Sequence, residues 1–152
     1  MLRCWLLGSG LVLSLAVTAA EPGVRTQFVG GTLAGVPVKS SARLDITGAD
    51  ALLLRAGTTE LRIAYPRINT LEYGQNVSRR YAAAILISPV LLLSKSRKHF
   101  LTIGYTDPDG RQQALVLRVE KGDIRSVLAG LEARTGRRIE YQDAEARKAA
   151  KG

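Results

Sequence analysis

The stretch HFLTIGYTDPDGRQQALVLRVE, residues 99–120, gives the clearest fold signal in the chain. Its two ends, His99–Tyr105 and Gln113–Glu120, are rich in the β-branched, aliphatic and aromatic residues that are typical of strands. Between them lies the sequence DPDG at 107–110, in which proline presets one backbone torsion and glycine accepts a positive φ. Two such runs joined by such a turn predict a β-hairpin.

Upstream of this hairpin the apolar residues mostly recur with a period of two, which indicates further strands. Short polar or glycine-containing turns separate these runs, and Pro66 interrupts pairing between the last two. The strands that we expect here are residues 42–46, 51–55, 60–65 and 68–73. Residues 21–35, which are rich in glycine and threonine, predict a leader with one edge strand.

After the hairpin the apolar period changes to 3.6, which predicts a helix over residues 123–135. One apolar stripe follows from the spacing of Ile124, Val127, Leu128 and Leu131. We expect Asp123 to cap the first turn and Gly136 to end the helix in the left-handed conformation. Residues 139–141 predict a short extended piece, and residues 142–152 predict a disordered, charged tail.

This order of elements predicts a mainly β fold with one C-terminal α-helix, a small barrel or sandwich that the helix caps. Three stretches resemble bacterial pleckstrin-homology-like (PH-like) proteins of unknown function: RIAYPRINTLEYG at 62–74, KHFLTIGYTDPDG at 98–110 and LAGLEARTGRRI at 128–139. The resemblance implies a fold and a binding role, and it implies no reaction. The phosphoinositide-binding loop of eukaryotic members has no counterpart in this sequence.

The first twenty residues have the pattern of a signal peptide. A short positive start is followed by an apolar run and by the small residues TAA before Glu21. The alternative is an uncleaved anchor helix, for which the run is short. Removal of residues 1–20 takes away one cation, Arg3, and no anion, which lowers the formal net charge from +9 to +8. We therefore expect an exported protein of the periplasm or cell envelope, with one domain over residues 21–141.

Residues 82–93, AAAILISPVLLL, form an apolar segment in which only Ser88 is polar. Its large aliphatic side chains are those of Ile85, Leu86, Ile87, Val90, Leu91, Leu92 and Leu93. Each is worth about 1.5–3 kcal/mol when buried, so exposing all of them would forfeit on the order of 10–20 kcal/mol. Because this exceeds the net stability of many domains, we expect the segment to be covered.

Three covers fit the sequence: the core of the domain itself, a second chain, or lipid. Cations flank the segment on both sides: Arg79, Arg80, Lys95, Arg97 and Lys98. Each would gain about 1 kcal/mol near an anionic leaflet, although charges also flank buried strands and limit their aggregation. As one helix the segment would reach about 18 Å, which is enough to dip into a bilayer and too short to span it.

Signatures of catalysis and of metal binding are scarce. His99 is the only histidine, and the chain beyond residue 20 has no cysteine, which excludes a histidine–cysteine metal site. We interpret His99 as a partly exposed surface residue, and Asp107 and Asp109 as turn residues. We therefore expect no enzyme, no catalytic residue, no metal and no cofactor. An export signal, an aromatic content of 5% and the lack of a recognisable motif also argue against nucleic acid as a partner.

Two hypotheses about function remain. The first is a module that docks peripherally on an anionic membrane through the apolar segment and its cations. The second is a protein-interaction or self-associating scaffold domain of the envelope that uses the same segment, with a homo-oligomer as one form. In both, the predicted contact residues are Arg79, Arg80, Ile85, Leu86, Ile87, Val90, Leu91, Leu92, Leu93, Lys95, Arg97 and Lys98.

Overall fold

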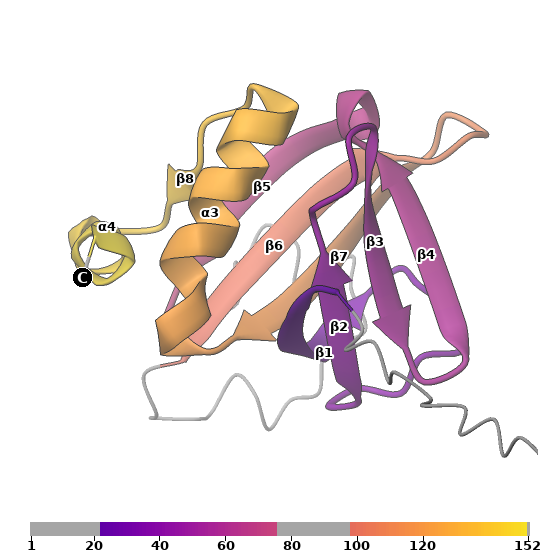
Figure 1. Cartoon of the computed structure of the whole chain (residues 1–152), viewed down its shortest axis with the longest axis horizontal. Helices are drawn as coiled ribbons and strands as arrows, with labels where there is room; N and C mark the ends of the chain where they lie inside the picture. Colours follow the sequence, from indigo (N-terminus) through magenta and orange to yellow (C-terminus); the bar gives the residue numbers. More distant parts are fainter. Residues whose placement is uncertain (1–21, 76–97, 152) are drawn as a thin grey trace, which may run out of the picture.

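The computed structural model describes residues 22–75 and 98–151, which form one eight-stranded sheet and two α-helices (Figure 1). The first half of the chain contains β1 (Val24–Gly31), β2 (Ser41–Asp45), β3 (Ala51–Ala56), β4 (Thr59–Ala64), the 3-10 helix η1 (Tyr65–Arg67) and β5 (Ile68–Gly74). The second half contains β6 (His99–Thr106), β7 (Gln112–Val119), α3 (Lys121–Thr135), β8 (Glu140–Tyr141) and α4 (Ala144–Lys151).

The strands follow the order β4-β3-β2-β1-β7-β6-β5-β8, and the sheet is not closed into a barrel. All neighbouring strands are antiparallel except β5 and β8, which are parallel. Figure 1 shows β2–β4 running across the direction of β5 and β6. The predicted fold class, mainly β with a C-terminal helix, is confirmed. The PH-like assignment stays a prediction.

Strand β1 is not an edge strand, and our prediction for residues 21–35 was wrong on this point. It lies between β2 and β7, so it joins the two halves of the sheet. An added Cβ at Gly31 would lie only 2.6 Å from the carbonyl oxygen of Ala114, so glycine permits the close approach of β1 to β7. At position 31, therefore, glycine reflects tight strand packing and not an irregular leader.

The core lies between α3 and one face of the sheet, which we call the inner face. Cross-strand pairing places Phe28 of β1, Leu117 of β7 and Leu101 of β6 side by side on this face. The predicted helical stripe Ile124, Val127, Leu128 and Leu131 is buried in the same cluster, as expected. On the opposite, outer face, Phe100, Thr102 and Val116 are at most 4% exposed. The middle parts of β6 and β7 are therefore shielded from water on both faces.

The ends of α3 agree only partly with the sequence prediction. The helix begins at Lys121, two residues before Asp123, and its N-cap Glu120 makes no side-chain capping hydrogen bond. Asp123 therefore lies inside the first turn, and its predicted capping role was wrong. At the other end, Gly136 adopts a φ of 68° and its N–H donates to the carbonyl oxygen of Glu132 at 2.9 Å. The predicted left-handed end is confirmed.

Residues 142–151 are described by the structure and include a helix, where the sequence analysis predicted a disordered tail. They form α4, in which Ala146 and Ala150 are buried one turn apart in the main core cluster. The carboxylate of Asp143 accepts a hydrogen bond from the backbone N–H of Ala146 at 2.6 Å, which caps the helix. The small alanine side chains permit this packing. Because α4 has no large apolar residue, its sequence gives no clear signal of a buried face.

The core predicts a large effect for Leu131→Ala, because this α3 side chain is fully buried. The variant should lose about 2–5 kcal/mol of unfolding free energy, through lost burial and the cavity that remains. Urea unfolding followed by circular dichroism measures this loss. The control Ala133→Ser, on the exposed side of the same helix, should change stability by about 0.5 kcal/mol or less. Equal effects of the two changes would contradict the assignment of the inner face.

Candidate functional site

Most of the predicted contact surface lies outside the described residues. Among its members only Lys98, which directly precedes β6, falls within them, and this residue is partly buried. The predicted contacts of residues 79–97 therefore stay predictions. What the structure does define is the place where this part of the chain leaves and re-enters the sheet.

The exit and the return are side by side at one end of the sheet. Strand β5 ends at Gly74, β6 begins at His99, and Gly74 is paired with Phe100 across these two neighbouring strands. Figure 1 shows both strand ends at the lower edge of the molecule. Whatever residues 76–97 contact, they are tethered at this end.

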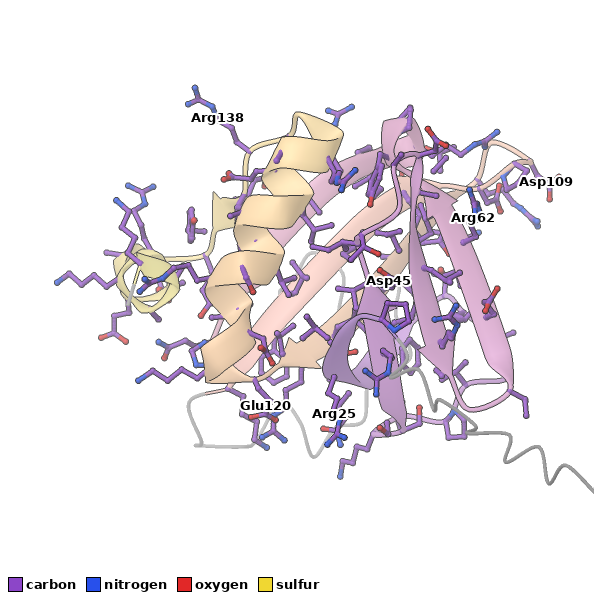
Figure 2. All side chains as sticks on the ribbon, in the orientation of Figure 1. Arg25, Asp45, Arg62, Asp109, Glu120 and Arg138 are labelled. Atoms are coloured by element: carbon purple, nitrogen blue, oxygen red, sulfur yellow. The ribbon has the colours of Figure 1, made fainter. Side chains whose placement is uncertain are left out.

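A row of three arginines crosses the outer face at the same end. Arg25 of β1 is paired with Arg43 of β2, and Arg43 is paired with Arg55 of β3. Residues directly opposite each other in an antiparallel pair have Cβ atoms about 4.5–5.5 Å apart on one face. Figure 2 shows Arg25 at the lower edge beside Glu120, with Arg62 toward the opposite end. The sequence alone does not reveal this arginine row, because the three residues become neighbours only through the pairing of β1, β2 and β3.

The arginines border a shallow groove of about 430 Å³, together with Ser41, Ala42 and Gly57. The Nη1 group of Arg43 donates to the carbonyl oxygen of Gly23 at 3.0 Å, and Nε of Arg55 donates to Oε2 of Glu60 at 3.0 Å. Arg25 is exposed. Like charges directly opposite each other in a sheet are destabilising, and the row contains two such pairs. The groove is therefore a positively charged surface with partly fixed donors.

His99 belongs to an aromatic cluster near the same end. Its Nδ1 atom is hydrogen-bonded to the hydroxyl of the fully buried Tyr73, and the two rings are stacked with centroids 6.0 Å apart. Tyr141 of β8 meets Tyr73 edge-on, and the guanidinium of Arg147 lies 5.7 Å from the Tyr141 ring centroid. Burial lowers the pKa of His99, and the positive charge of Lys121 lowers it further. The negative charge of Glu120 acts in the opposite direction. These contacts give the histidine a structural role.

A second hollow of about 380 Å³ lies at the far end, between β4 and the β6–β7 hairpin. Its polar lining includes Arg67 and Asp107. The carboxylate of Asp107 accepts hydrogen bonds from the backbone N–H groups of Asp109 and Arg111 and from the side chain of Gln113. The Arg111 backbone bond is the main cause of the lowered pKa of Asp107. This carboxylate stabilises the turn at 107–110, as the sequence predicted, and is not placed as a general base.

Within residues 22–75 and 98–151, no group of three or more histidine, cysteine or acidic side chains is arranged to hold a metal ion. In the same part of the chain, no helix has the length and hydropathy needed to cross a membrane. The sequence matches no protein-family model and has no significant match among curated proteins. The function must therefore be inferred from the surface itself.

The lowered pKa of His99 predicts how stability changes with pH. The unfolded chain, with an ordinary histidine pKa of about 6.5, takes up the proton before the folded protein does as the pH falls. The contribution of His99 to stability should therefore be constant above about pH 7 and decrease as the pH falls below about 6.5. Urea midpoints between about pH 7.5 and 5 measure this decrease. In His99→Gln the decrease should be smaller, and parallel profiles of the two proteins would contradict the assignment.

Proposed function

We propose that the protein is a non-enzymatic, exported binding module that docks peripherally on an anionic membrane surface. In this proposal residues 82–93 enter the lipid interface, and the flanking cations contact anionic head groups. The observation that carries the proposal is the position of the tethers: residues 76–97 leave the sheet at the same end as the arginine row. Apolar and cationic groups would then face the same surface.

The energetic basis is the burial of the large aliphatic side chains between residues 85 and 93. Each gains about 1.5–3 kcal/mol on leaving water, and each cation near an anionic leaflet adds about 1 kcal/mol. Lys98 and the arginine row contribute cations from the described residues, with Glu60 and Glu120 as the acidic groups nearby. The resemblance to PH-like proteins supports a binding role and does not indicate the ligand.

Two other covers for the segment lead to different behaviour. In the scaffold hypothesis it forms an interface with another chain, and in the simplest case with a second copy of this one. In the third case it packs on the protein's own sheet, for which the buried outer face around Phe100 and Val116 would be a suitable neighbour. The variant described next separates these cases, because lipid binding, self-association and folding are measured on the same protein.

The membrane proposal predicts that Leu91→Asp combined with Leu92→Asp abolishes vesicle binding. Two leucines contribute about 3–6 kcal/mol, so partitioning should fall about 100-fold or more. Flotation with phosphatidylcholine vesicles, with and without phosphatidylglycerol, measures this, and wild-type protein should float only with the anionic lipid. The control Val38→Asp, at an exposed apolar residue of the β1–β2 connection, should float like wild type.

Undiminished flotation of the folded double variant would reject the proposal. A wild-type dimer that the double variant dissociates, without lipid binding by either protein, would establish the scaffold hypothesis instead. A lipid-indifferent monomer that the double variant unfolds would show that the segment is part of the core.

A further inference from the structure

We infer that the arginine row is an oxyanion site whose ligand is a phosphate group. Three guanidinium groups come from three adjacent strands, at positions directly opposite one another on the outer face. The inference rests on the geometry of this row and does not require the membrane proposal. It assigns a ligand chemistry to a groove whose lining residues all lie outside the apolar segment.

The first step is the repulsion within the row. In each of the two directly opposed arginine pairs, the Cβ atoms are expected within about 5.5 Å of each other on one face. Like charges in such pairs are destabilising. Glu60 supplies one carboxylate, bonded to Arg55 at the end of the row. Arg25 lies at the other end and is exposed, and no carboxylate among the described residues forms an ion pair with it. A bound anion would add a counter-charge to the row.

The second step is the arrangement of the donors. Planar guanidinium groups present paired N–H donors that match the oxygens of phosphate. Arg43 is held by its bond to the Gly23 carbonyl and Arg55 by its bond to Glu60, so neither begins as a freely rotating side chain. The groove also contains Ser41, whose hydroxyl can donate, and its volume of about 430 Å³ accommodates a phosphate with bound water.

The third step is the choice among cations. Arg62 of β4 provides a natural comparison, since it lies toward the other end of the molecule from Arg25 (Figure 2). It lines the second hollow and does not contribute to the arginine groove. If anions were attracted only by the basic charge of the protein, Arg62 and the arginine row would contribute equally to binding. If the site is built by the strand register, binding requires the row and does not require Arg62.

The test uses the whole protein in lipid-free buffer, with inorganic phosphate as the probe and chloride at matched ionic strength as the reference. Isothermal calorimetry should show saturable phosphate binding, and phosphate should raise the melting temperature more than chloride does. Arg25→Gln combined with Arg55→Gln should weaken binding at least tenfold, while Arg62→Gln should leave it unchanged.

A second arm identifies the source of the phosphate. Displacement of wild-type protein from phosphatidylglycerol vesicles by inorganic phosphate would assign the site to lipid head groups. Phosphate binding without such displacement would assign it to a soluble phosphate compound. Absence of saturable binding, or equal weakening by Arg62→Gln, would overturn the inference. Because this readout does not use the apolar segment, it can fail while vesicle flotation succeeds, and the reverse also holds.

Discussion

The ladder between β1 and β7 holds the two halves of this protein together. These strands lie about ninety residues apart in sequence, yet Thr26 is paired with Val119 and Phe28 with Leu117. On one side β1 continues into the meander β2–β4, and on the other β7 continues into β6 and β5. Without this ladder the sheet would separate into two smaller sheets, and α3 would lose part of the surface on which it packs. The same ladder brings Arg25 to the end of the sheet where β6 begins.

Local signals predicted much of the fold. The β6–β7 hairpin was predictable because its turn contains both proline and glycine, and α3 because its four apolar residues keep helical spacing up to Gly136. Strand pairing between distant segments leaves no such local trace. The central position of β1 could not be predicted, because it results from a contact with β7. Helix α4 could not be predicted either, because it packs through two small alanine side chains. Neither feature changes the local hydrophobic period.

The candidate surfaces divide in the same way. The apolar segment at 82–93 is visible in the sequence because its composition alone demands a cover. The arginine row is not, since Arg25, Arg43 and Arg55 stand far apart in the chain and meet only through the register of β1, β2 and β3. One surface is therefore a property of composition and the other a property of topology. Their common location, at one end of the sheet, connects the proposed membrane contact with the proposed phosphate site.

Hydrogen–deuterium exchange of residues 82–93 tests the central claim of membrane docking most directly, because it reports on the cover of this segment without changing the sequence. The membrane account predicts rapid exchange of these amides in the lipid-free protein and in the presence of neutral vesicles. It also predicts strong protection when phosphatidylglycerol vesicles are added. Equal protection with and without anionic vesicles, in a protein that remains monomeric, would contradict the account and place the segment inside the domain.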